Sequence, residues 1–437
     1  MKTLRCGAAE KIVTPALGLN IPCCMAPHYS TGIKDDLYTH ALAVECDGKT
    51  VILISIDTSG LGSKFSKKLR AAITAEIGVP ADAIMVCATH IHTGGPQLLD
   101  IFWGQGEDEE VNELFHRQSL AAAVEAYNKM VEVNVRFGEC EEHRIAFCRN
   151  YHMKDGTILM NPGRTRAANI VKPTTPIDPT VGAIRFDDLS GKTVAEIVNF
   201  ACHPDTVGGY EYCADYPGAL RQELKKAYGD HTVVFINGCS GNINHVDYLR
   251  YTREPEFKYP KDHYKYMGGI LAEDVLGIHE KNETVAPTPV VDYAVRRFRA
   301  QRRQPTEADM AWADEKLALV DGSKVDKRLA EELYRLKKHP KKTEIVEMQV
   351  LRVGDLYIVG FPGEPFSDIA TRLREKTKGK DLMISEIANN VMGYFATEPA
   401  FSGNVYEARL PSDPFEVDVL DKMIDVAAEL VEKLAKQ

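Results

Sequence analysis

Two histidines two residues apart, His90 and His92, are the residues whose types and spacing first suggest chemistry. They follow an apolar run at 83–87 that is typical of a short buried strand, which we expect to end at Thr89. Since side chains two apart on a strand point to the same face, both imidazoles are expected in one pocket. Two neutral imidazoles on one rigid edge often begin a metal site, although an isolated pair is equally typical of unrelated histidines.

Three further segments carry a chemistry-bearing side chain after an apolar run. His203 precedes Pro204, which pulls the chain out of a strand, so its ring is expected to be held rigidly as a metal ligand or simply to cap a turn. Glu364 follows a Pro-Gly turn near the start of a helix, where a carboxylate binds metal or caps the helix. Tyr394 lies in a glycine-containing turn and is, on its own, typical of packing. Loops at strand ends are where rigid sheets present catalytic groups.

A fourth segment, residues 233–245, joins a buried strand to a turn rich in Gly, Ser and Asn. The backbone N–H groups of such a turn could form an anion-binding nest for a developing oxyanion. Ser240 invites a nucleophile interpretation, but the G-x-S-x-G spacing fails because Asn242 occupies the position of the last glycine. We therefore expect Ser240 and Asn242 to contact substrate rather than to perform the attack.

Short apolar, β-branched runs alternate with helical patterns along the chain, which predicts an α/β layered domain. The expected strands are 51–56, 84–87, 197–201, 233–236, 345–351 and 356–361, and the expected helices are 64–77, 112–130 and 217–228. Short turns at 187–192 and 353–355 are typical of hairpins, so the sheets are expected to be mixed and flanked by helices.

The segment 304–342 differs because it is dominated by charged residues, Ala and Leu. Thr306 begins a predicted helix, 321–323 breaks it, and a second helix runs to about Lys338. We expect a polar helical hairpin inserted at the surface, with solvated faces and no chemistry. The stretch 414–436 predicts one more amphipathic helix, and the whole chain, 1–437, is expected to be a single domain.

Composition excludes several classes of protein. With 53 Lys+Arg against 63 Asp+Glu, the net charge of −10 gives no electrostatic case for binding nucleic acid. The chain has no apolar run long enough for a transmembrane segment and no visible signal peptide, so we expect a cytoplasmic protein. Its ten scattered cysteines are then expected to be reduced thiols.

The ordered set of motifs resembles the catalytic domain of the neutral/alkaline (non-lysosomal) ceramidases. The segments that carry the resemblance are 12–15, 31–38, the T-H-x-H stretch 89–96, the His-Pro pair 203–204, the Pro-Gly-Glu motif 362–364 and the N-x-x-x-x-Y-x-x-T motif 389–397. The resemblance implies a zinc ion (Zn2+) held by His90, His203, Glu364 and Tyr394. It also implies that His92 lies beside the metal, where it hydrogen-bonds substrate or transfers a proton.

The chain departs from that family at one chemically important position. The catalytic serine of ceramidases corresponds to Asn244 here, so the resemblance leaves metal-activated water as the nucleophile, with the Asn244 amide donating to the carbonyl oxygen. The β-sandwich domain that follows the catalytic domain in ceramidases is not expected within these residues. Together with the absent export signal, this argues against ceramide itself as the substrate.

The leading hypothesis is a zinc-dependent hydrolase that cleaves the amide bond of a small N-acyl substrate. His92 or His245 would give the proton to the leaving amine, and Arg149 would hold a polar substrate group unless it forms an internal salt bridge. A metal-dependent esterase or lactonase would use the same site, and a non-catalytic binding protein on this scaffold is a third alternative. The sequence leaves open whether the chain forms a homo-oligomer.

Overall fold

The computed structural model describes residues 3–21, 28–96, 98, 108–283, 285, 288–321 and 323–436. Its largest sheet has eight strands in the order β14 (Thr232–Asn237), β12 (Thr193–Phe200), β11 (Thr180–Asp188), β6 (Val131–Glu141), β1 (Arg5–Ile12), β3 (Tyr38–Cys46), β4 (Lys49–Ile56) and β5 (Ile84–Ala88). A second sheet has four strands, β16 (Val291–Gln301), β17 (Thr343–Val353), β18 (Leu356–Gly360) and β20 (Asp381–Ser385).

Four smaller ladders complete the strands. They are β10 (Ile170–Pro173) with β8 (Asn150–Met153) and β9 (Ile158–Met160), β13 (Glu211–Tyr212) with β2 (Gly32–Ile33), β15 (Ile243–Asn244) with β7 (Phe147–Cys148), and β19 (Glu364–Pro365) with β21 (Tyr394–Phe395). The α-helices are α1 (Ser63–Ile77), α2 (Glu109–Asn128), α3 (Asp215–Tyr228), α4 (Arg250–Arg253), α5 (His263–Lys281), α6 (Glu307–Ala318), α7 (Lys324–Lys338), α8 (Ser367–Lys376), α9 (Glu398–Ser402) and α10 (Val417–Ala435). None of the helices in the described ranges is long and apolar enough to cross a membrane.

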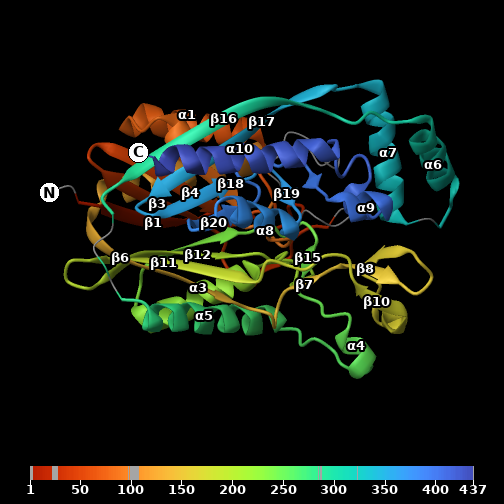
Figure 1. Cartoon of the computed structure of the whole chain (residues 1–437), viewed down its shortest axis with the longest axis horizontal. Coiled ribbons are helices and arrows are strands. Elements are labelled where there is room, and N and C mark those ends of the chain that lie inside the picture. The colour runs from red at the N-terminus through yellow and green to blue at the C-terminus, as the bar shows by residue number, and fades with distance from the viewer. Residues whose placement is uncertain are drawn as a thin grey trace.

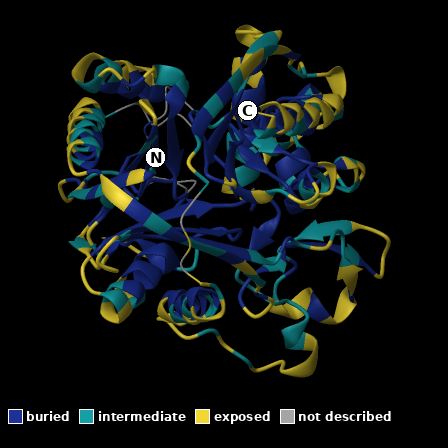
Figure 2. Ribbon diagram, turned by 60° about the vertical axis from the view of Figure 1, so that its left-hand side comes forward, coloured by how far each residue is buried: buried dark blue, intermediate teal, exposed yellow. Residues whose placement is uncertain are grey.

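Both large sheets are mixed and flanked by helices, which confirms the predicted α/β class. The predicted turns at 187–192 and 353–355 lie between antiparallel strand pairs, β11–β12 and β17–β18. Helices α1 and α2 cover one part of the eight-stranded sheet, α3 and α5 cover another, and α8 and α10 cover the four-stranded sheet (Figure 1). Strands β4, β5, β12, β14 and β18 are almost wholly buried, whereas β6, β16 and the outer faces of the helices carry exposed residues (Figure 2).

Three parallel strand pairs, β4–β5, β12–β14 and β18–β20, end close together. The Asn199 amide of β12 donates at 2.9 Å to the carbonyls of Ile236 in β14 and Ile384 in β20. Asn389, which follows β20, donates its backbone N–H to the Val86 carbonyl of β5 at 2.6 Å and accepts the Val86 N–H at 3.0 Å. These buried amides fasten the three pairs to one another, so their carboxyl ends face a common space, the usual place for a site in α/β sheets.

The predicted helical hairpin is formed by α6 and α7. The Thr306 hydroxyl accepts the N–H of Asp309 at 3.1 Å and the Asp309 carboxylate accepts the N–H of Thr306 at 2.8 Å, which forms a capping box at the start of α6. The apolar faces of the two helices pack against each other and against Leu410. The hairpin therefore supports the segment just after α9 rather than standing free in solvent.

A buried charge cluster outside the space shared by the strand ends gives a first prediction. Glu196 of β12 is buried between His231 and His279, and it accepts from both imidazoles. Burial opposes ionisation, but the hydrogen bonds from the two histidines outweigh it and lower the pKa of Glu196 below its ordinary 4.5. The ionised carboxylate thus stabilises the fold above that pH, and the contribution is lost as the pH falls through the lowered pKa.

We expect Glu196→Gln to weaken the acid dependence of stability. The unfolding free energy of the variant, measured by urea titration, should fall less between about pH 5 and about pH 3 than that of the unsubstituted protein. Equal losses of unfolding free energy in the two proteins over that interval would contradict the assignment.

Candidate functional site

His90 is placed by a strained turn rather than by a strand. β5 ends at Ala88, and His90 has a φ of 69°, which is unusual for a residue other than glycine. The expectation that His90 and His92 share a strand face is therefore wrong, because the chain leaves the sheet before either residue. They come together through the turn, in which the His90 N–H donates to the Thr58 carbonyl at 3.0 Å and the His92 N–H donates to the Pro204 carbonyl at 3.1 Å.

His203 approaches His90 from the other side of the space. β12 ends at Phe200, earlier than predicted, and His203 lies three residues farther on, just before Pro204. Its Nδ1 is 2.8 Å from the Ser240 carbonyl, while Nδ1 of His90 is 2.6 Å from the Ser59 carbonyl. A carbonyl oxygen only accepts, so each Nδ1 carries a hydrogen and each neutral ring turns the lone pair of its Nε2 into the space between them.

Three acceptor atoms converge at this point. The two Nε2 atoms of His90 and His203 are 3.2 Å apart, and Oε2 of Glu364 lies 3.4 Å from each of them. Oε2 is buried and has no hydrogen-bond partner among the described residues. Ligand atoms around a tetrahedral zinc ion at bond lengths of 2.0–2.1 Å are about 3.3 Å apart. The chemistry and spacing of these donors therefore fit a zinc-sized cation.

The pKa values of two of the clustered side chains, His90 and Glu364, are shifted in the directions that favour positive charge beside Glu364. Burial opposes protonation of His90, but the nearby charge of Glu364 outweighs this effect and raises the pKa of His90 to about 9. Burial likewise opposes ionisation of Glu364, but the two imidazoles hold its pKa well below the usual range. Both shifts favour a positive charge between these side chains, which a proton or a metal ion can supply.

Tyr394 is placed beside Glu364 by strand pairing. β19 and β21 form a parallel ladder in which Glu364 is the direct partner of Tyr394. The Tyr394 hydroxyl lies 3.3 Å from Nη2 of Arg149, and the guanidinium carbon is 5.6 Å from the phenol ring centre. Burial, reinforced by the charge of Glu364, raises the pKa of Tyr394 well above its ordinary value. The phenol is therefore neutral here, and only a nearby cation would favour its ionised form.

Arg149 is held by an internal salt bridge. Its Nε donates at 2.7 Å to the carboxylate of Glu407, and its Nη2 donates at 2.8 Å to the Gly241 carbonyl. Arg149 is 5% exposed and Glu407 is completely buried. The geometry therefore favours the salt-bridge alternative over direct substrate binding, with Arg149 holding the Tyr394 phenol in place.

His92 offers a further ligand atom. Its ring centre is 5.1 Å from that of His90 and 5.6 Å from that of His203, and one ring nitrogen of each of the three histidines lies within 4.8 Å of the others. Nε2 of His92 is buried without a hydrogen-bond partner among the described residues. Burial and the neighbouring His90 lower the pKa of His92 to about 3, so the ring is neutral. This nitrogen can complete the metal site or accept a proton beside it.

Ser240 and Glu386 form a buried layer behind His203. The Ser240 hydroxyl donates at 2.8 Å to Glu386 and lies 3.2 Å from Nδ1 of His203. Glu386 also accepts the Ser240 N–H at 3.0 Å and the Asn237 amide at 2.8 Å, and burial raises its pKa to about 7. Partners of this kind can orient the His203 ring, and the Ser240 hydroxyl is itself held by Glu386.

We expect Ser240→Ala to weaken metal binding without abolishing turnover. The backbone carbonyl that holds His203 remains, while one hydrogen bond to Glu386 is lost, so metal affinity should fall about 10- to 100-fold. Competition with a chromogenic chelator measures the affinity, and turnover is compared at saturating metal. A variant with full metal occupancy and no turnover would instead make Ser240 the nucleophile.

Most backbone N–H groups of the anion nest expected in the 237–244 turn already donate to acceptors within the protein. Backbone N–H groups of residues 238, 240, 241 and 243 donate to Phe200, Glu386, Pro365 and Ser240. Asn242 is buried, and its Oδ1 accepts the N–H of Ser367 at 2.8 Å. Asn242 therefore caps the start of α8, the role that the sequence had left open for Glu364.

Asn244 and His245 follow this turn. The Asn244 amide donates to Asn161 at 2.7 Å, and its oxygen accepts the Val246 N–H at 3.0 Å, which leaves one amide hydrogen for a substrate oxygen. Nδ1 of His245 lies 3.1 Å from Oδ1 of Asp205. Asp205 was not among the candidates from sequence, although it directly follows the His-Pro motif and could have been found there.

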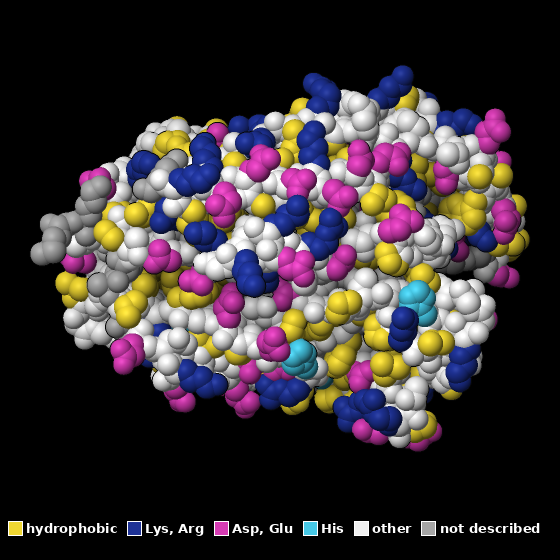
Figure 3. Space-filling model, in the orientation of Figure 1, with side chains coloured by type: hydrophobic (Ala, Val, Ile, Leu, Met, Phe, Trp, Pro, Cys, Tyr) yellow, Lys and Arg dark blue, Asp and Glu magenta, His cyan; other side chains and the backbone are white. Residues whose placement is uncertain are grey.

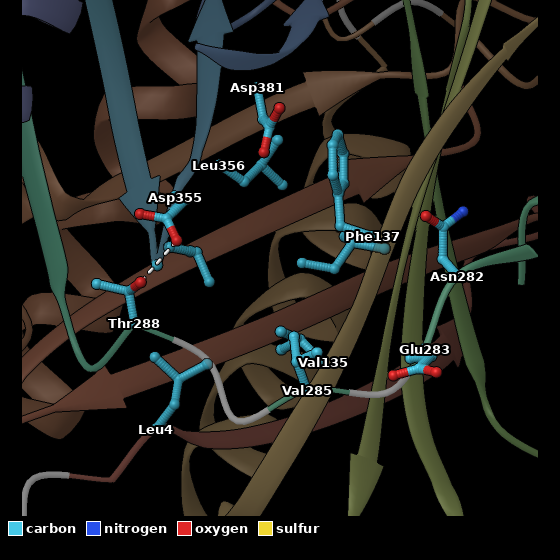
Figure 4. Close-up of a pocket in the computed structure, with 13 residues that line it drawn as sticks. Leu4, Val135, Phe137, Asn282, Glu283, Val285, Thr288, Asp355, Leu356 and Asp381 are labelled. Atoms are coloured by element: carbon cyan, nitrogen blue, oxygen red, sulfur yellow. Dashed lines mark hydrogen bonds between the residues drawn. The ribbon is translucent and has the colours of Figure 1, made fainter. Parts of the chain in front are cut away.

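A cavity at another place in the fold lacks this chemistry. It has a volume of about 330 Å³ and lies between β6, β18 and β20 (Figure 4). Val135, Phe137 and Leu356 contribute apolar walls, and Asp355 accepts from Thr288 at 2.6 Å. No histidine or cysteine is among its described lining residues. On the face shown in Figure 3, acidic and basic side chains are interspersed.

Comparisons with known proteins bear on the fold. No protein-family model matches the chain, and a comparison with curated proteins finds no match. Among solved structures, the neutral ceramidase from Pseudomonas aeruginosa is similar, with a TM-score of 0.79 and 15% identity over 100% of this chain and 75% of that chain. A ceramidase complexed with C2 is also similar, with a TM-score of 0.76 and 14% identity over 100% of this chain and 76% of that chain. The chain therefore has a neutral-ceramidase-like fold.

Proposed function

We propose that this protein is a zinc-dependent hydrolase that cleaves the amide bond of a small N-acyl substrate. The observation that carries the proposal is the convergence of the His90 and His203 Nε2 atoms with the Glu364 carboxylate at 3.2–3.4 Å. Tyr394 is proposed as the fourth ligand because its strand register places it beside Glu364. The likeness to the two ceramidase structures supports a hydrolase, because those proteins are named as ceramidases and share this fold.

When bound, zinc would polarise the substrate carbonyl and lower the pKa of water to about 7. Side chains of the protein would orient the substrate and hydrogen-bond its reacting groups. His92 would hydrogen-bond the reacting groups through its unpartnered Nε2, and the free amide hydrogen of Asn244 would donate to the carbonyl oxygen. Arg149 would keep the Tyr394 phenol in position, with its own charge balanced by Glu407.

A panel of substrates that share one acyl group tests this proposal. Purified protein loaded with zinc is assayed on an N-acyl alkylamine, the corresponding alkyl ester and an acyl lactone, before and after removal of metal with a chelator. We expect amide hydrolysis that is lost with the metal and restored by adding zinc. Hydrolysis of the ester or the lactone without hydrolysis of the amide would favour the esterase or lactonase alternative. If none of the three substrates is hydrolysed at full metal occupancy, the proposed function is rejected.

A further inference from the structure

His245 is held in one orientation by a carboxylate and two rings. Its Nδ1 lies 3.1 Å from Oδ1 of Asp205, and its ring centre is 6.0 Å from that of Tyr259 and 5.6 Å from that of His263. The side chain is 15% exposed, so it is enclosed but reachable. With Nδ1 directed at the carboxylate, Nε2 is the nitrogen left for a substrate.

Asp205 is itself fixed by its loop. Asp215, which is fully buried, accepts the N–H groups of Thr206 and Val207 at 3.0 Å each, and it also accepts the Thr206 hydroxyl. These three contacts hold the chain immediately after Asp205. The Asp205 carboxylate therefore stands on a fixed backbone, because the two residues that follow it are held by Asp215.

This pair lies at the edge of the candidate metal cluster. Asp205 is two residues from His203, and the intervening Pro204 accepts the His92 N–H at 3.1 Å. The Asp205 carboxylate interacts electrostatically with both His92 and His203 as well as with His245. His92 lies among the ligand nitrogens, whereas His245 stands outside them with a carboxylate of its own. Asp205 therefore links His245 to the loop that carries His203.

We propose that Asp205 and His245 form a proton-transfer dyad, in which His245 protonates the leaving amine and Asp205 is a positioning residue that fixes its orientation. The proposal rests on the proposed hydrolase function and adds a division of roles to it. An imidazole whose Nδ1–H donates to a carboxylate presents Nε2 in one tautomer and stabilises the imidazolium that forms during transfer.

The step balances among the amide substrate, water, the dyad and solvent. The water oxygen forms a bond to the carbonyl carbon, the π pair moves to the carbonyl oxygen, and the water proton passes to solvent. On collapse the C=O bond re-forms and the C–N bond breaks. The nitrogen keeps the bonding pair and takes a proton from Nε2 of His245, and a proton from solvent restores Nε2, which gives an acid, an amine and the starting dyad.

Leaving-group dependence tests the dyad. We expect His245→Gln to lower kcat/KM for an N-acyl alkylamine about 10²- to 10⁴-fold, while the p-nitrophenyl ester of the same acid loses less than about 10-fold. The difference arises because p-nitrophenolate leaves without being protonated. Asp205→Asn should shift the amide-to-ester ratio in the same direction, and Asp205→Glu should restore part of it. Imidazole added to His245→Gly should recover amide turnover.

A surface pair provides the matched control. His143 lies 3.1 Å from Glu141 and is exposed, so His143→Gln should leave both rates unchanged. Equal losses on amide and ester in His245→Gln, or no loss on either, with metal retained, would overturn the dyad while leaving the hydrolase proposal intact. A zinc-loaded wild-type protein inactive on both substrates would instead overturn the proposed function, and the dyad with it.

Discussion

Replacing His203 with alanine is expected to remove the bound metal and to lower kcat/KM on the order of 10³-fold or more. The variant loses one of three acceptor atoms that lie 3.2–3.4 Å apart, and the remaining pair, His90 and Glu364, can satisfy each other as an ion pair. Metal content by mass spectrometry and turnover on the amide substrate are measured on the same preparation. Both are expected to fall together, because the same atom serves binding and catalysis.

His116→Ala is the matched control for this substitution. His116 of α2 also has a buried, unpartnered Nε2, but it packs against Phe65 with ring centres 6.3 Å apart and lies outside the cluster. We expect it to keep both metal and turnover. A His203→Ala protein that retains stoichiometric metal and its activity would contradict the proposed ligand set.

Replacing Glu407 with leucine is expected to destabilise the fold by about 3–5 kcal/mol. The carboxylate is completely buried and accepts from Arg149 at 2.7 Å and from the Asn150 amide at 3.2 Å. Its loss leaves the Arg149 guanidinium charged in a buried site, with the Gly241 carbonyl and the Tyr394 hydroxyl as its remaining partners. Urea titration of the purified variant measures the change in unfolding free energy.

A double-mutant cycle separates the charge from the packing. Arg149→Met removes the stranded cation, so the variant with both substitutions should be more stable than Glu407→Leu alone. Arg372→Ala, which breaks an exposed pair with Asp421, should change stability little. Strictly additive effects at Arg149 and Glu407 would contradict a coupled buried pair.

The sequence predicted the fold class because part of its signal is local. Apolar, β-branched runs located β4, β5, β12 and β14 of the eight-stranded sheet and β17 and β18 of the four-stranded sheet to within about four residues, and the turns at 187–192 and 353–355 located antiparallel hairpins. Strands β1, β3, β6, β11, β16 and β20 were not among the predicted strands. Thr306 marked the start of α6, since the capping box that it forms with Asp309 is complete within four residues. Such patterns depend on residues that are close in the chain, so they can be recognised in the sequence without knowledge of tertiary contacts.

The site was predictable in part for a different reason. His90 and His203 lie in loops that follow strands, Glu364 lies in the short strand β19 soon after β18, and motif order linked them to one another. The reason given for pairing His90 with His92 was wrong, because a residue with φ of 69° interrupts the strand pattern. Asp205 was adjacent to a recognised motif and was overlooked.

Other residues required the fold itself. Glu386 reaches Ser240 from 146 positions away and Glu407 reaches Arg149 from 258 positions away, so no local spacing could associate them. The same contacts turn Ser240 and Arg149 toward the protein interior, as the hydrogen bond from the Ser367 N–H does for Asn242. Sequence pattern identified these residues as polar groups near a site but could not show which partners satisfy them.

Anomalous diffraction from crystals grown with zinc tests the central claim most directly. Data collected on both sides of the zinc absorption edge should show one strong anomalous peak within about 2.0–2.2 Å of the Nε2 atoms of His90 and His203 and of the Glu364 carboxylate. An ordered site without such a peak at saturating zinc, or a peak bound by other residues, would contradict the account.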